Sequence, residues 1–143
     1  MARFSQRSLQ ALKGVHPYMV HVMCEAIRDT PVDFTIVSGL RTTQEQQALY
    51  AQGRTKPGQK VTNADGVKNL SNHQDEADGL KDGYGAAVDL YPYVNGGVDV
   101  NDRGNHLPAI AAHIKSTAKR LGYTVEWGGD WRSFVDRPHF ELK

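Results

Sequence analysis

Apolar residues recur at steps of three or four residues, or at sums of these steps, along the first part of the chain. The positions that follow this period are Leu9, Leu12, Val20, Met23 and Ile27. The pattern predicts an amphipathic helix over residues 8–28, which Pro17 can interrupt. A second and clearer stripe comprises Leu107, Ile110, Ala111, Ile114, Ala118 and Leu121. It predicts a late helix that ends at Gly122, because glycine is the preferred residue just beyond a helix C-terminus.

Short runs of β-branched, aromatic and aliphatic residues predict four strands. They lie at residues 33–37, 86–91, 124–127 and 138–142. After the first strand, Thr42 and Glu45 form a capping-box pattern that opens a helix through about residue 52. Residues 53–85 have no periodicity, and an irregular segment of this length is usually functional or disordered. The order of the elements predicts an α+β fold, in which helices flank a small antiparallel sheet.

Composition narrows the classes of protein that fit. With 143 residues, of which 39% are hydrophobic, the chain suits a single domain over residues 1–143. Seventeen Lys and Arg residues against 16 Asp and Glu residues leave a net charge of +1, so bulk charge does not support binding to nucleic acid. No secretory signal or membrane span is visible. The only cysteine, Cys24, cannot form an internal disulfide, and we expect a buried thiol in the first helix.

Three residues outside the helical stripes are candidates for metal binding. His73 lies in the irregular segment, His139 lies in the last predicted strand, and Asp89 interrupts the apolar run AAVDL. An ionised Asp89 in such a run needs a metal ion or a hydrogen-bonded cation to offset its desolvation. Two imidazoles and one carboxylate are typical of a catalytic zinc site with an open fourth position. Asp136, three residues before His139, could then act as a base beside the metal.

Each of these candidates also has a purely structural interpretation. His73 can be a solvated loop residue, and His139 can be a strand residue that is hydrogen-bonded to a carbonyl group. Asp89 can be a buried cap or an ion-pair partner. Six histidines in 143 residues allow accidental trios, so the spacing of these residues does not decide between the two interpretations.

Several motifs, taken as a set, resemble a known family. Ser71, His73, Gly85, Ala87 and Asp89 resemble a divided SxHxxGxAxD signature, and Asp136 with His139 resembles [DE]xxH. Both are signatures of the zinc D-alanyl-D-alanine carboxypeptidase superfamily. SGLRT at residues 38–42, DLYPY at 89–93 and GGDW at 128–131 add to the likeness. Over residues 34–142 the chain is most similar to phage endolysins that act as L-alanyl-D-glutamate peptidases, which implies a Hedgehog/DD-peptidase-like fold.

The resemblance implies a role for each matching residue. His73, Asp89 and His139 would bind one zinc ion per chain. Asp136 would be the general base, and Arg41 the cation that faces the substrate carbonyl. By spacing alone, Arg41 could equally be paired with Glu45 at the start of the helix.

The main departure from the family pattern is the distance between the first two ligands. The signature separates them by seven residues, whereas His73 and Asp89 are 16 apart, so residues 74–85 contain an insertion. Its acids are Asp75, Glu76, Asp78 and Asp82. We expect a solvated acidic loop, with a calcium-binding or regulatory loop as the alternative.

The resemblance predicts a monomeric enzyme that acts on bacterial peptidoglycan, most closely on the L-alanyl-D-glutamate bond. A D-alanyl-D-alanine carboxypeptidase is the alternative with the same chemistry. An alternative from a different functional class is a catalytically silent cell-wall-binding module on the same fold. Such a module would be expected to lack a metal ligand or the base, whereas all four positions are filled here. Without a signal peptide, such a lysis protein is expected to wait in the host cytoplasm until another factor opens the membrane.

Overall fold

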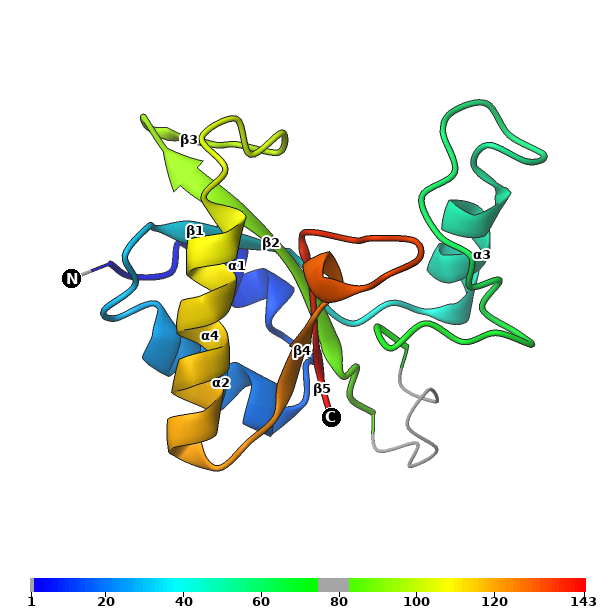
Figure 1. Ribbon diagram of the computed structural model, residues 1–143. Coiled ribbons are helices and arrows are strands. Elements are labelled where there is room, and N and C mark those ends of the chain that lie inside the picture. The colour runs from blue at the N-terminus through cyan, green and yellow to red at the C-terminus, as the bar shows by residue number, and fades with distance from the viewer. Residues whose placement is uncertain (1, 75–82) are drawn as a thin grey trace.

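The computed structural model describes residues 2–74 and 83–143. Its helices are α1 (Gln6–Ala11), α2 (Pro17–Ala26), α3 (Thr43–Ala51) and α4 (Leu107–Leu121), with a 3-10 turn η2 (Gly128–Asp130). Its strands are β1 (Phe34–Ser38), β2 (Ala87–Val94), β3 (Gly97–Val98), β4 (Val125–Trp127) and β5 (His139–Leu142). The sheet order is β1-β2-β5-β4, with β3 on β2, and all of these pairs are antiparallel (Figure 1). The predicted α+β class is therefore confirmed.

The N-terminal helix predicted over residues 8–28 is interrupted just before Pro17, the residue at which the sequence allowed a break, and the structure has two helices there. Gly14 lies between them with φ of 82°, in the left-handed region that favours glycine. Pro17 is the first residue of α2, where its missing N–H costs no helical hydrogen bond. The chain therefore turns back before Pro17, and both helices reach the same core.

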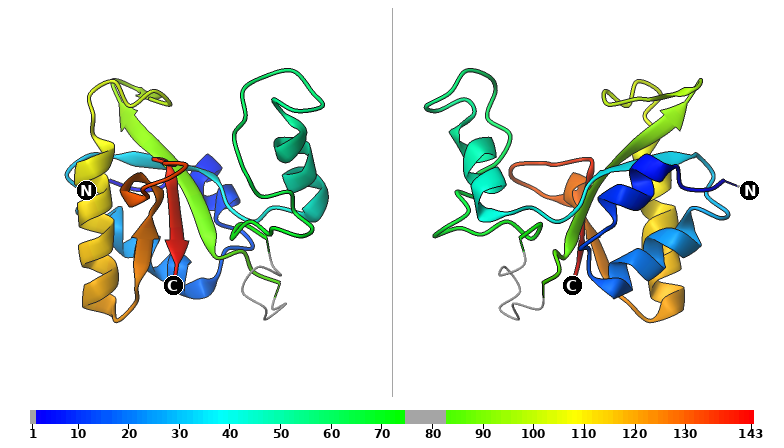
Figure 2. Two further views of the ribbon diagram at one scale, coloured as in Figure 1. Left: turned by 45° about the vertical axis from the view of Figure 1, so that its right-hand side comes forward. Right: turned by 180° about the vertical axis from the view of Figure 1, so that it is seen from behind.

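Alternation along β2 separates the core from the functional side of the sheet. Val88, Leu90 and Pro92 are buried, whereas Asp89 and Tyr91 on the other face are partly exposed. Helices α1, α2 and α4 cover the apolar face (Figure 2). The largest fully buried apolar side chains are Phe34, Phe140, Met19, Met23, Ile36, Leu90, Leu107, Ile110 and Ile114. The opposite face is left free for polar side chains.

Local signals that need no long-range partner are confirmed. Thr42 and Glu45 form the predicted capping box at the start of α3, and Gly122 ends α4 in the left-handed conformation.

The prediction that Cys24 is a buried thiol is wrong, because its side chain is exposed. Cys24 follows the buried Met23 directly, and the apolar stripe of α2 turns away from it. The two-residue strand β3 has no counterpart among the predicted strands.

Helix α3 and residues 52–72 form an arm beside the sheet (Figure 2). Two buried glutamines hold the arm together and join it to the rest of the molecule. Gln46 donates to Thr62 Oγ1 and to the Ala64 carbonyl, and Gln74 donates to the Gly66 carbonyl at 3.1 Å. None of the helices in the described part of the chain combines the length and the apolar character of a membrane span.

Candidate metal centre

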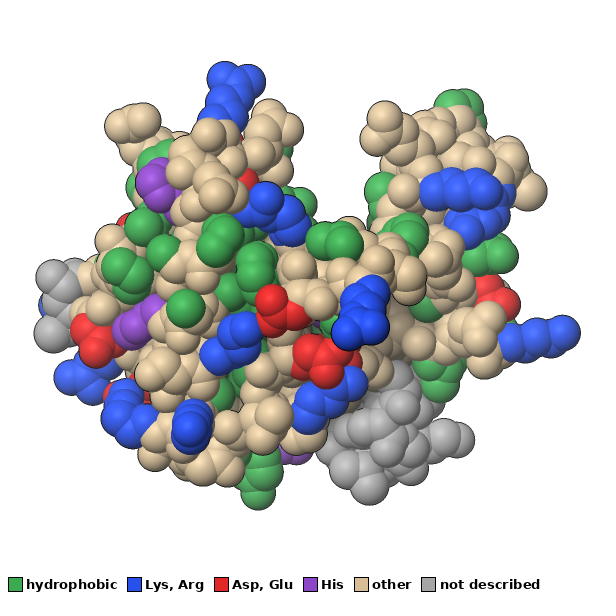
Figure 3. Space-filling view, viewed as in Figure 1, with side chains coloured by type: hydrophobic (Ala, Val, Ile, Leu, Met, Phe, Trp, Pro, Cys, Tyr) green, Lys and Arg blue, Asp and Glu red, His purple; other side chains and the backbone are tan. Residues whose placement is uncertain are grey.

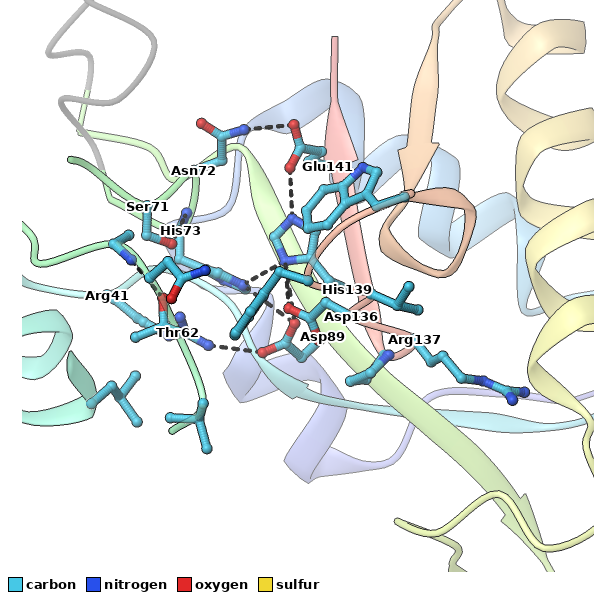
Figure 4. A pocket seen from close by; sticks show the side chains of 18 of the residues that line it. Arg41, Thr62, Ser71, Asn72, His73, Asp89, Asp136, Arg137, His139 and Glu141 are labelled. Carbon is cyan, nitrogen blue, oxygen red and sulfur yellow. Dashed lines mark hydrogen bonds and ion pairs between the residues drawn. The ribbon is translucent and has the colours of Figure 1, made fainter. Parts of the chain in front are cut away.

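Strands β2 and β5 bring two of the predicted site residues together. Asp89 and His139 are direct partners in the antiparallel register. Their neighbours Val88 and Phe140 also pair, and they point into the core. Because side chains alternate along each strand, Asp89 and His139 must both lie on the face away from the core. Figure 4 shows the two side chains pointing toward one another there.

His73 reaches the same place from the irregular segment. Its Nδ1 lies 2.9 Å from the Gly39 carbonyl oxygen, and its own carbonyl accepts a hydrogen bond from Arg41 N at 2.8 Å. These two contacts fix both the ring and the backbone of His73. The side chain is almost fully buried, at 1% exposure.

The long spacing between His73 and Asp89 does not separate them in space. Ala86 N donates to the Asn72 carbonyl at 2.8 Å, so the chain closes across the insertion. A Cβ on Gly85 would lie 2.5 Å from the His73 carbonyl oxygen, so this approach requires a glycine. The predicted calcium-binding alternative falls on Asp75, Glu76, Asp78 and Asp82, which lie outside the described residues.

Three atoms of His73, Asp89 and His139 form a compact triangle. His73 Nε2 lies 3.2 Å from His139 Nδ1 and 3.3 Å from Asp89 Oδ1, and the third side, from His139 Nδ1 to Asp89 Oδ1, is 3.5 Å. Asp89 Oδ1 is buried and accepts no hydrogen bond. A buried acceptor without a donor is rare in native proteins and calls for an explanation. The three side chains could hold a metal ion.

The far side of His139 is held by a carboxylate that the sequence motifs do not include. His139 Nε2 lies 2.7 Å from Glu141 Oε1, and Glu141 Oε2 accepts hydrogen bonds from Asn72 at 2.6 Å and from Lys143 at 2.7 Å. With Nε2 bound to Glu141, Nδ1 is the nitrogen of His139 that faces the centre. Partners of this kind orient a metal-binding histidine and raise its basicity.

The charges of this network shift several pKa values. Burial opposes ionisation of Glu141, but hydrogen bonds from His139 and Lys143 lower its pKa to about 2. Burial also disfavours the cationic form of His139, yet the facing carboxylates of Asp89 and Glu141 raise its pKa to about 9. For Asp89, burial is outweighed by the facing imidazoles and Arg41, which hold its pKa well below the usual range. The centre is therefore an ion-paired cluster in the absence of a metal.

Arg41 is joined to the centre and not to Glu45. Its NH2 lies 2.8 Å from Asp89 Oδ2, and its NH1 donates to Gln46 Oε1 at 3.1 Å. Glu45 instead accepts from the backbone of Thr42 within the capping box. The expected alternative of an Arg41–Glu45 pair is thus wrong. Arg41 holds the second oxygen of Asp89, which leaves the first oxygen facing the two imidazoles.

Asp136 lies beside the triangle on the loop that precedes β5. Its Oδ2 is 3.9 Å from His139 Nδ1, and a third of its side chain is exposed. The backbone N–H of Asp136 donates to the Gly128 carbonyl at 3.0 Å, which anchors the loop to η2. Burial and the charge of Asp89 raise the pKa of Asp136, and the nearby cations offset this only in part.

These residues line one cavity of about 720 Å³ between the sheet and the arm. Figure 3 shows the surface hollowed between the two parts. Trp131 stands over His139 with ring centroids 5.1 Å apart, and Tyr91 of β2 lines the cavity beside Asp89. Burial, followed by the charges of Asp89 and Asp136, raises the pKa of Tyr91. The cavity therefore opens onto the triangle of His73, Asp89 and His139, onto Asp136 and onto Tyr91.

The structure unites all five predicted site residues and adds others. His73, Asp89, His139, Asp136 and Arg41 all line the cavity. Glu141, Asn72 and Tyr91 were not assigned roles from the sequence. The period of two along the strands would have found Glu141 and Tyr91, since each lies two residues beyond a predicted ligand. No local signal identifies Asn72.

Comparisons with known proteins agree with one another. The sequence model of the family described as phage L-alanyl-D-glutamate peptidase matches residues 1–142. The peptidoglycan L-alanyl-D-glutamate endopeptidase CwlK of Bacillus subtilis (strain 168) is 32% identical over 151 residues, covering 96% of this chain and 81% of that protein. The L-alanyl-D-glutamate peptidase of Escherichia phage T5 is 28% identical, with coverage of 99% and 89%. The crystal structure of the Serratia marcescens L-Ala D-Glu endopeptidase ChiX superposes with a TM-score of 0.72 at 30% identity, covering 99% of this chain and 90% of that one.

Proposed function

The chain belongs to the phage L-alanyl-D-glutamate peptidase family, and from this we propose that it is a zinc peptidase that hydrolyses the L-alanyl-D-glutamate bond of bacterial peptidoglycan. The observation that carries the proposal is the triangle of His73, Asp89 and His139 at the base of an open cavity. Asp136 lies next to it. A metal site, a neighbouring carboxylate and access for a substrate are what a metallopeptidase requires.

The three side chains fit a zinc ion by chemistry and by spacing. Nitrogen and oxygen ligands placed tetrahedrally around zinc at their usual distances are about 3.3 Å apart, and the sides of the triangle measure 3.2 to 3.5 Å. A cation between the imidazoles would also give the buried Asp89 Oδ1 the partner that it lacks. Three protein ligands leave a fourth position open, as in catalytic zinc sites. We expect one zinc ion per chain.

The residues around the site have distinct tasks. A bound zinc ion supplies a Lewis acid that polarises a carbonyl group and acidifies water. Asp136 takes the proton of the attacking water on a carboxylate oxygen and passes it to the amine that leaves. Arg41 fixes Asp89 through NH2, and its remaining N–H groups face the substrate carbonyl as the carbonyl oxygen becomes negative. Glu141 keeps His139 oriented.

The setting of the reaction follows from the same proposal. The protein acts on the cell wall as a monomer, and it waits in the host cytoplasm until another factor opens the membrane. Light scattering of the purified protein tests the monomer. Fractionation of infected cells before and after lysis tests the location.

Digestion of purified peptidoglycan, followed by mass spectrometry of the soluble products, tests the function. Cleavage at the proposed bond creates a new amino terminus on D-glutamate and leaves L-alanine on the glycan side. Release of free D-alanine alone would indicate a D-alanyl-D-alanine carboxypeptidase. Binding without any cleavage would indicate a wall-binding module. Protein stripped of metal and the His73→Ala variant are the matched controls, and both should be inactive.

A further inference from the structure

Tyr91 lines the cavity, but the proposed mechanism gives it no role. It lies two residues after Asp89 on β2, so strand alternation directs both side chains to the same face of the sheet. Tyr91 lines the cavity together with Asp136 and His139. Its side chain therefore stands beside the reacting groups and not in the core.

The hydroxyl group of Tyr91 is uncommitted. It forms no hydrogen bond with any described residue, although a buried tyrosine hydroxyl usually has a partner. Across residues 2–74 and 83–143, the buried side-chain polar atoms without a partner are Asp89 Oδ1 and Arg137 Nε. Because the Tyr91 oxygen is not among them, it must be accessible to solvent, and Tyr91 is one of the residues that line the cavity. A substrate can therefore reach it.

Arg41 and Asn72, two donors that line the cavity, are already engaged with protein acceptors. Arg41 donates to Asp89 and Gln46, and the side-chain amide of Asn72 donates to Glu141. The carboxylate of Asp89, which is paired with Arg41, offsets much of the guanidinium charge. Less of that charge is then available to stabilise the carbonyl oxygen as it becomes negative. A neutral donor that needs no rearrangement would add stabilisation there.

We propose that Tyr91 is a further catalytic residue, whose hydroxyl donates a hydrogen bond to the carbonyl oxygen of the bond being cleaved. The hydrogen bond strengthens as that oxygen becomes negative, so it stabilises the transition state more than the bound substrate. Tyr91 keeps its proton throughout, and the proton of the attacking water goes to Asp136. A phenol that ordinarily ionises near pH 10 remains a donor across the neutral range. This inference rests on the proposed peptidase function.

The substitution Tyr91→Phe removes the hydroxyl and keeps the ring. Loss of one such donor typically lowers kcat by about 10²-fold or more, so we expect a fall of that order with KM changed by less than about threefold. Zinc content and melting temperature should match those of the wild-type protein. Tyr93→Phe is the matched control, because Tyr93 lies on the same strand, is exposed and does not line the cavity. It should leave kcat unchanged.

A tetrahedral phosphinate analogue of the L-alanyl-D-glutamate dipeptide separates a catalytic role from a structural one. Tyr91→Phe should weaken binding of the analogue by about the same factor as it lowers kcat/KM. Binding of the cleavage products should not change. A kcat within about threefold of the wild-type value would overturn the proposal, and so would a large loss of kcat with full affinity for the analogue.

The two proposals fail in distinguishable ways. If the wild-type protein cleaves peptidoglycan and Tyr91→Phe is unimpaired, Tyr91 is removed from the mechanism and the peptidase remains. If the zinc-loaded wild-type protein cleaves no peptidoglycan, the proposed function is wrong and the role of Tyr91 falls with it.

Discussion

Replacement of Asp136 by asparagine removes the proposed general base while it changes the site as little as possible. Asparagine has nearly the same shape as aspartate, but its amide cannot accept the proton of the attacking water at neutral pH. No side-chain donor of the described residues forms a hydrogen bond with Asp136, whose nearest cationic contact is His139 at 3.9 Å. The substitution therefore breaks no hydrogen bond that supports the fold.

The structure sets the size of the expected effect. Burial and the charge of Asp89 already disfavour the ionised form of Asp136 and raise its pKa, so loss of the charge should not destabilise the protein. General-base catalysis typically contributes about 10² to 10⁴-fold. That factor corresponds to about 3 to 5 kcal/mol of transition-state stabilisation. We expect a loss of activity in this range with the fold and the zinc content retained.

Three measurements on the same preparation make this prediction decisive. They are the initial rate of peptide release from purified peptidoglycan, the zinc content by mass spectrometry and the thermal melting curve. Asp130→Asn is the matched control on the adjacent turn, because Asp130 forms an exposed ion pair with Lys115 and does not line the cavity. Its rate should equal that of the wild-type protein. Undiminished cleavage by zinc-loaded Asp136→Asn would refute the assignment of Asp136 as the general base.

Three further predictions concern the metal centre. Glu141→Gln should weaken zinc binding by about 10 to 100-fold through loss of the charged partner of His139, measured by competition with a fluorescent chelator; unchanged affinity would exclude an orienting role. Because the pKa of His139 is raised to about 9 in the metal-free protein, zinc must displace a proton from His139 in order to bind. The affinity for zinc should therefore fall about tenfold for each pH unit below that value. Equal zinc affinities at about pH 7 and 8 would contradict this. Gly85→Ala should destabilise the fold by about 1 to 3 kcal/mol and weaken zinc binding, because the new Cβ would lie 2.5 Å from the His73 carbonyl oxygen. Chemical denaturation measures the loss of stability, and Gly97→Ala, with open space around the new Cβ, is the control that should stay near the wild-type stability.

Much of the local structure could be predicted because its causes lie within a few residues. The apolar stripe of α4 and the capping box of Thr42 and Glu45 are short-range patterns, and each appears where it was expected. The N-terminal region shows the limit of this reasoning. Its apolar period continues on both sides of Gly14 and Pro17, so Pro17 marked a possible break, but packing of both segments on one core decided that the chain turns there.

The sequence by itself determined the classes of side chain available for chemistry and, through the family motifs, which histidines and acids to examine. Only the tertiary structure decided that they meet. The register of β2 and β5 sets Asp89 opposite His139, and closure of the chain across the insertion returns His73 to the same point. The tertiary structure also decided that Arg41 contacts Asp89, and that Glu141 and Tyr91 share the same side of the sheet. These contacts join segments that are distant in the sequence, and their geometry is set by the packing of the whole chain, so no local pattern along the sequence specifies them.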